Sequence, residues 1–110
     1  MTDSDLTRDG VLTEELLGPL TELERRNAPA RLYFAGNRDL LVHRPRVAVV
    51  GARDATEAGL RRAERVAKIL AAEGLTIVSG LARGIDTVAH QTAIALGSGT
   101  IAVLGGPLDN

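Results

Sequence analysis

The sequence predicts an α/β fold: a partial Rossmann-like parallel sheet of about three core strands with flanking helices, preceded by a short helical segment. Three short apolar runs alternate with helical patterns from residue 46 onward, and each run ends at a glycine, namely Gly51, Gly80 and Gly105. Right-handed crossovers place successive parallel strands side by side. The three carboxyl ends should therefore meet at one edge, which is where open α/β sheets bind ligands.

Residues 11–26 carry apolar side chains at close to helical spacing and predict a helix. Thr13 is a candidate N-cap, and the acidic residues that follow it favour the start of a helix. Gly18 and Pro19 interrupt the pattern, so we expect two short helices rather than one.

Residues 32–35 are a candidate for a short strand, and residues 36–39 read as a turn. The stronger α/β pattern begins only afterwards. We therefore divide the chain into an N-terminal helical extension, residues 1–30, and a partial Rossmann-like domain, residues 31–110.

The later part of the chain repeats a strand–helix plan. Short continuous apolar runs are typical of strands buried on both faces. The expected strands are residues 47–50, 75–78 and 100–104, and the expected helices are residues 57–73 and 84–96. Gly74 is the expected C-terminal cap of the first helix. Its predicted buried face consists of Leu60, Ala63, Val66, Ala67 and Leu70.

Composition excludes several classes of protein. The chain has no cysteine, so it has no disulfides and no thiolate metal site, and two distant histidines argue against any metal site. No apolar run approaches the roughly 20 residues that span a bilayer. The N-terminus lacks the basic start and apolar stretch of a signal peptide. We expect a cytoplasmic protein without membrane association, metal or cofactor.

The net charge of −1 conceals an asymmetry. Residues 1–30 carry seven acidic and three basic side chains, which leaves ten basic and seven acidic side chains in the remainder. Nine of those ten are arginines, which bind phosphate with two parallel hydrogen bonds. The excess permits a phosphate-bearing ligand, although an arginine-rich genome explains it equally well.

Gly51-Ala52-Arg53 follows the first predicted strand. Glycine allows a ligand to approach the backbone closely, and free amides near a helix start attract anions. Arg53 could add a bidentate contact to a phosphate. A turn glycine followed by a solvated arginine is the equally weighted structural alternative.

The second loop precedes the next predicted helix and combines two glycines, a hydroxyl and an arginine. It comprises Ser79, Gly80, Leu81, Ala82, Arg83 and Gly84. Neither a P-loop nor a dinucleotide-binding glycine pattern is present. For Asp86 we favour helix-dipole compensation and capping over a ligand role. For His90, four residues later, we favour a partly packed histidine that can pair with Asp86 and hold the first turn.

The third loop contains Gly105 and Gly106. These glycines would suit a backbone that lines a binding site, but turn formation explains them as well. Their assignment to the phosphate site rests on position.

At these loops the sequence resembles the DNA-processing protein A family (DprA, also called Smf), from about Pro29 to Asp109. The matching stretches are Leu32-Tyr33 with Gly36 and Leu40-Leu41, Val47–Arg53, Ser79–Asp86, Ala89-His90, and Ile101–Gly106 ahead of Leu108-Asp109. The segment from Ser79 to Asp86 is the most specific of these.

The resemblance implies a Rossmann-like domain that binds single-stranded DNA and assists the loading of RecA recombinase during natural transformation and recombination. It implies no catalytic residue and no enzymatic activity. It places Arg53 on the DNA backbone, with Ala52 in place of the family's usual hydroxyl residue. It also places Ser79, Gly80, Arg83 and Gly84 in the same pocket.

The chain also departs from the family pattern. The family's domain continues beyond residue 110, and Pro107 is an extra residue. Three strands with exposed edges favour pairing with another chain, for example in a homodimer. Two alternatives stay open: a nucleotide-binding sensor or nucleotide-processing enzyme of the wider superfamily, and a truncated fragment that binds nothing.

Overall fold

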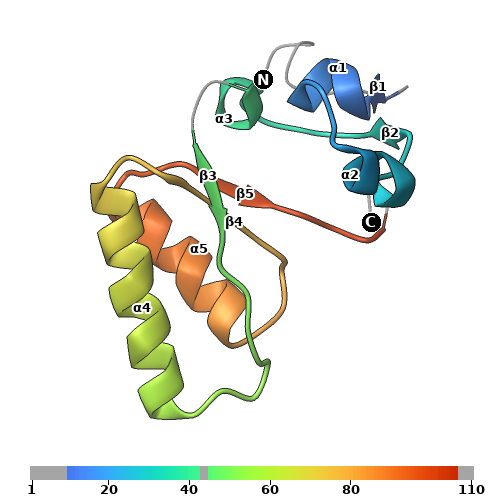
Figure 1. Cartoon of the computed structure of the whole chain (residues 1–110). Coiled ribbons are helices and arrows are strands. Elements are labelled where there is room, and N and C mark those ends of the chain that lie inside the picture. The colour runs from blue at the N-terminus through green and yellow to red at the C-terminus, as the bar shows by residue number, and fades with distance from the viewer. Residues whose placement is uncertain (1–9, 43–44, 107–110) are drawn as a thin grey trace. The chain divides into compact units, whose positions relative to one another are not determined.

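The computed structural model describes residues 10–42 and 45–106. The chain forms two compact units, one of Met1–His43 with Leu108–Asn110 and one of Arg44–Pro107 (Figure 1). The division into residues 1–30 and 31–110 stays a prediction. The features expected at His43 and at residues 107–109 lie outside the described residues.

The first unit contains a two-stranded antiparallel sheet and three short helices. The strands are β1 (Val11–Leu12) and β2 (Arg31–Leu32), and the helices are α1 (Thr13–Leu17), α2 (Glu22–Asn27) and α3 (Asp39–Val42). The predicted break between two helices is confirmed: Gly18 has φ +89° and Pro19 follows it. Val11 and Leu12, the first residues of the predicted helical pattern, pair with β2 instead, and α1 begins at Thr13.

Two local predictions in this unit were wrong. Thr13 does not cap α1; it is buried, and its hydroxyl donates to the carbonyl of Pro29. The second strand covers Arg31–Leu32 and not residues 32–35, because only these two residues find partners on β1.

A capping box begins α2. The Glu24 N–H donates to the Thr21 hydroxyl at 3.1 Å, and the Thr21 N–H donates to the Glu24 carboxylate at 2.8 Å. The pKa of the Glu24 carboxyl lies below its ordinary value. The larger cause is the hydrogen bond from the Thr21 backbone, and the smaller is the interaction with the Thr21 hydroxyl. The sequence motif Thr-x-x-Glu was the available signal for this cap.

The capping box predicts a pH dependence of α2. Because the Glu24 pKa is lower in the folded chain, the cap stabilises α2 fully above the ordinary glutamate pKa, and the effect is lost as pH falls through the lowered value. Titration of the Glu24 carboxyl carbon by NMR should give a midpoint below that of an unstructured glutamate. Glu24→Gln should remove the pH dependence of the Thr21 amide shift; a persistent dependence would contradict the assignment.

The second unit confirms the predicted α/β fold. Its parallel strands are β3 (Arg46–Ala48), β4 (Thr76–Ser79) and β5 (Thr100–Ala102), in the order β3-β4-β5. The crossover helices are α4 (Glu57–Ala72) and α5 (Ile85–Ala95), and both cover the same face of the sheet (Figure 1). The carboxyl ends of the three strands thus point in one direction, as expected.

Small side chains form the core between sheet and helices. Ile77 of β4 is fully buried against Ala67 of α4 and against Ala89 and Ala93 of α5, and Val49 packs on this cluster. Alanine lets the helices approach the sheet closely.

One part of the predicted α4 face was wrong. Its buried residues are Ala63, Ala67 and Ala71, which succeed each other every four residues, whereas Val66 is 47% exposed. Leu60 and Leu70 are half-buried, so the fully buried part of the helix face consists of alanines and is narrower than the apolar pattern indicated. The Thr56 hydroxyl accepts the Gly59 N–H at 3.0 Å and so caps the helix start.

Candidate nucleic-acid interface

The first two loops after the strands lie directly against each other. A Cβ atom on Gly51 would lie 2.7 Å from Cγ1 of Ile85. Gly84, the N-cap of α5, has φ +83°, and a Cβ there would lie 2.5 Å from both the Ala52 and the Arg53 carbonyl oxygens. The Ile85 N–H donates to the Ala52 carbonyl at 3.3 Å. Glycine is therefore needed at both positions for the loops to meet.

The two loop arginines differ in their partners. The Arg53 side chain is exposed and makes no hydrogen bond or ion pair with any residue that the structure describes. Arg83 donates to one oxygen of Asp54, from Nη2 at 2.9 Å and from Nε at 3.3 Å. Both partners are largely exposed, so this pair contributes only about 0–1 kcal/mol. An incoming phosphate could thus replace Asp54, while Arg53 is already free.

The N-terminus of α5 carries no side-chain cap. The capping role predicted for Asp86 was therefore wrong, although its place in the first turn suits the helix dipole. Within residues 45–106, the amides of Asp86 and Thr87 have no acceptor. Unpaired first-turn amides are donors for a ligand.

His90 joins the second loop to β5. Its Nε2 lies 2.7 Å from the Gly80 carbonyl oxygen, and its Nδ1 lies 2.6 Å from the Thr100 hydroxyl. A carbonyl only accepts, so the neutral ring donates from Nε2 and accepts at Nδ1. The expected partly packed histidine that holds the second loop is confirmed, whereas the pair with Asp86 that the spacing allows does not form, because both ring nitrogens are bonded elsewhere.

The remaining second-loop residues serve the loop's own conformation. Ser79 is 2% exposed, and its hydroxyl donates to the Val49 carbonyl at 2.6 Å, so the hydroxyl is already occupied. The Ala82 carbonyl accepts the Thr87 hydroxyl at 2.8 Å. Leu81 is 64% exposed. Any ligand contact at Ser79 or Ala82 would have to come from the backbone.

The third loop meets the second loop through Val103, whereas its two glycines make no close contact. The Val103 N–H donates to the Ser79 carbonyl at 2.8 Å and ties the end of β5 to β4. Gly105 and Gly106, by contrast, are exposed and have open space where a Cβ would stand. The structure thus brings Gly51–Arg53 and Ser79–Gly84 together and leaves this glycine pair outside the contact.

Sequence reasoning missed the residues that hold the two loops. Asp54 pairs with Arg83 across 29 positions, and Ile85 packs on Gly51. Thr100 bonds His90 from the next strand. Spacing along the chain carries no signal for such pairs, which depend on the folded sheet.

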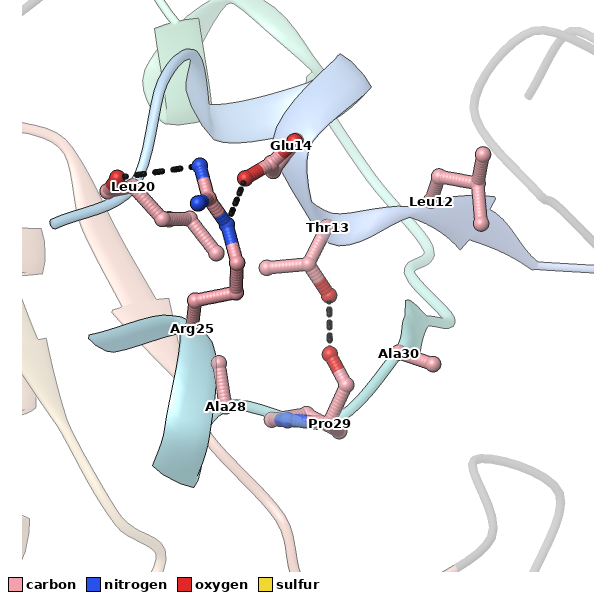
Figure 2. Close-up of a pocket in the computed structure, with 8 residues that line it drawn as sticks. All are labelled: Leu12, Thr13, Glu14, Leu20, Arg25, Ala28, Pro29 and Ala30. Carbon is pink, nitrogen blue, oxygen red and sulfur yellow. Dashed lines mark hydrogen bonds and ion pairs between the residues drawn. The ribbon is translucent and has the colours of Figure 1, made fainter. Parts of the chain in front are cut away.

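An open pocket of about 330 Å³ lies in the first unit (Figure 2). It is lined by Leu12, Thr13, Glu14, Leu20, Arg25, Ala28, Pro29 and Ala30. Its arginine already donates to the Glu14 carboxylate at 2.9 Å and to the Leu20 carbonyl at 3.5 Å. This pocket therefore offers a phosphate much less than the two loops do.

Residues 10–42 and 45–106 contain no group of three or more His, Cys, Asp or Glu side chains that could hold a metal ion. In the same part of the chain, no helix has the length and apolar character needed to cross a membrane.

Comparison with known proteins gives one consistent result. A family model described as DNA recombination-mediator protein A matches residues 15–110. DNA processing protein DprA of Streptococcus pneumoniae is 51% identical over 83 residues, which are 76% of this chain and 29% of that protein. Protein Smf of Escherichia coli is 43% identical over 81 residues, or 74% of this chain and 21% of that protein. The X-ray structure of the Streptococcus pneumoniae protein superposes on this chain with a TM-score of 0.68 at 49% identity. The matched region is 76% of this chain and 29% of the Streptococcus pneumoniae chain.

Proposed function

This chain belongs to the DNA recombination-mediator protein A (DprA/Smf) family, and from that membership we propose that it is a DNA-processing protein of natural transformation and recombination. It acts by binding single-stranded DNA at its first two loops, not as an enzyme. The chain spans less than a third of the length of these relatives. Its assistance to RecA loading, its pairing as a homodimer and its cytoplasmic location are parts of the same proposal.

One observation carries the DNA site. Arg53 is exposed, and no residue of the described ranges pairs with it, where two glycine-dependent loops meet at the carboxyl edge of a parallel sheet. A free guanidinium beside closely approachable backbone suits an anionic group such as a phosphate. Ligands of open α/β sheets bind at this edge.

The chemistry of the site favours the phosphate backbone over stacked bases. Tyr33 and Phe34 are the only aromatic residues, and both belong to the first unit. Arg53 would form two charge-assisted hydrogen bonds to one phosphate. Arg83 would exchange its exposed partner Asp54 for a second phosphate. Binding should therefore depend steeply on salt.

Arg53→Ala should weaken binding of a fluorescent oligo-dT by about 10-fold to 100-fold, because hydrogen bonds to charged groups contribute about 1.5–3 kcal/mol. It should also reduce the salt slope by about 0.7, the value for one phosphate of single-stranded DNA. Fluorescence anisotropy at about 50 and 200 mM salt measures both quantities.

Lys68→Ala is the matched control, since it removes one positive charge from the exposed face of α4. Lys68 lies eleven residues after Glu57, the first residue of α4, and thus about 16 Å along the helix axis from the end that follows the first loop. The Lys68→Ala variant should therefore leave the affinity for DNA nearly unchanged. Equal effects of the two variants would contradict the proposed site. Tight binding of a mononucleotide together with indifference to DNA would support a nucleotide sensor instead.

A further inference from the structure

We propose that Asp86 is a specificity-determining residue, whose carboxylate accepts a hydrogen bond from an N–H group of a nucleobase. This inference rests on the proposed binding of single-stranded DNA, since it names the chemical group of the strand that contacts the second loop. It replaces dipole compensation as the main role of this side chain.

Asp86 is a buried carboxylate without a partner. It is 7% exposed, and no other described residue forms a hydrogen bond or ion pair with its side chain. In the described ranges, Thr76 Oγ1 is the only side-chain oxygen or nitrogen that is both fully enclosed and without a hydrogen bond. The Asp86 oxygens have no hydrogen bond either, so they are not fully enclosed and a ligand can reach them. An unpaired buried carboxylate is costly. A donor from a ligand would offset that cost.

The carboxylate faces the second loop at the carboxyl edge of the sheet. Its Oδ2 lies 2.7 Å from the position that a Cβ on Gly80 would occupy, and the Val103 carbonyl oxygen lies 3.9 Å from the same position. The Gly80 carbonyl is bonded to His90. The carboxylate therefore stands between the ends of β4 and β5, beside the loop assigned to the DNA.

Charge excludes a phosphate as the group that meets Asp86. Two like charges in contact repel each other strongly near a protein surface. Within a DNA strand, the phosphates and the deoxyribose rings offer only hydrogen-bond acceptors. The bases are the part of the strand that carries N–H donors. A strand whose phosphate lies on Arg53 can satisfy Asp86 only by presenting the edge of a base.

Thymine gives the sharpest test, because N3–H is its single ring donor. Oligo-dT and an oligomer of 3-methylthymidine have equal length and charge but differ in this N–H. Wild-type protein should bind oligo-dT about 10-fold or more tightly than the methylated strand, the ratio expected for a hydrogen bond to a charged group. In Asp86→Asn this ratio should fall, because the amide oxygen still accepts from N3–H but carries no charge, and the salt slope should stay unchanged.

Glu73→Gln is the matched control. It makes the same carboxylate-to-amide change at the C-cap of α4, away from the end of the helix that follows the first loop. It should keep the wild-type ratio. Circular dichroism checks that each variant is folded. If Asp86→Asn does not fold, Asp86→Ala replaces it, since it removes the acceptor altogether, and a wild-type ratio near one overturns the proposal in either case.

The outcomes separate the two proposals. Equal binding of the two oligomers by the wild-type protein, or an unchanged ratio in Asp86→Asn, would overturn the role of Asp86. If salt-dependent binding and the Arg53→Ala effect persist in that case, the DNA site itself stands. Absence of binding to either strand would overturn both.

Discussion

Gly84→Ala is expected to lower the free energy of unfolding of the second unit by about 3 kcal/mol or more. Gly84 has φ +83° and ψ −128°, a region that is essentially restricted to glycine and costs other residues about 1–3 kcal/mol. The added methyl group would also lie 2.5 Å from two backbone carbonyl oxygens, which cannot move without shifting the first loop. Such overpacking costs about 1–3 kcal/mol more. Urea unfolding followed by circular dichroism measures the change.

Gly74→Ala provides the control for backbone strain alone. Gly74 follows α4 with φ +80°, and no atom lies near the position of an added Cβ. This variant should cost only about 1 kcal/mol, the usual penalty for a side chain in that conformation. Equal losses in the two variants would show that contact between the loops adds nothing to the cost at Gly84.

His90→Leu is expected to lower the free energy of unfolding by roughly 2–4 kcal/mol. It removes both hydrogen bonds of the ring and leaves the Gly80 carbonyl and the Thr100 hydroxyl without partners in a part-buried place. Each unsatisfied group costs about 1–3 kcal/mol. Faster hydrogen exchange of the amides in Ser79–Gly84 should accompany the loss, because the second loop is then held less firmly.

The conservative variant His90→Gln separates hydrogen bonding from packing. A glutamine amide can donate to the Gly80 carbonyl and accept from the Thr100 hydroxyl, so part of the stability and of the exchange protection should return. If leucine and glutamine behaved alike, the two hydrogen bonds would not be the reason for the loss.

The fold of the second unit could be predicted because its signals are local. Apolar runs ending at Gly51 and Gly80, and the helical spacing between them, describe strands and helices without knowledge of distant partners. Strand ends were less predictable: β3 stops at Ala48, and Val49 continues to bond with Val78 outside the regular ladder.

The candidate site was only partly predictable, because the hydrogen-bond partners of serine hydroxyl and histidine ring groups lie on other strands of the sheet. The contact between the first two loops follows from their strands being neighbours. The Ser79 hydroxyl, however, bonds to Val49, 30 residues away, and His90 bonds to Thr100 instead of Asp86. Spacing along one helix suggested the wrong partner for His90. The place of Gly105 in the DNA site stays a prediction, since the structure shows only that it has open space around it.

The buried alanines of α4 and α5 couple the core to the position of the first two loops. Ala67, Ala89 and Ala93 are fully buried, so the distance from each helix axis to the sheet is set by single methyl groups. A larger residue at any of them would overpack the contact with Ile77 and shift the helix that carries it. Because α5 starts at the contact between the loops, such a displacement would move Gly84 and Ile85 relative to Gly51. Substitutions deep in the unit and far from Arg53 should therefore alter the proposed DNA binding by moving the helix that positions the second loop.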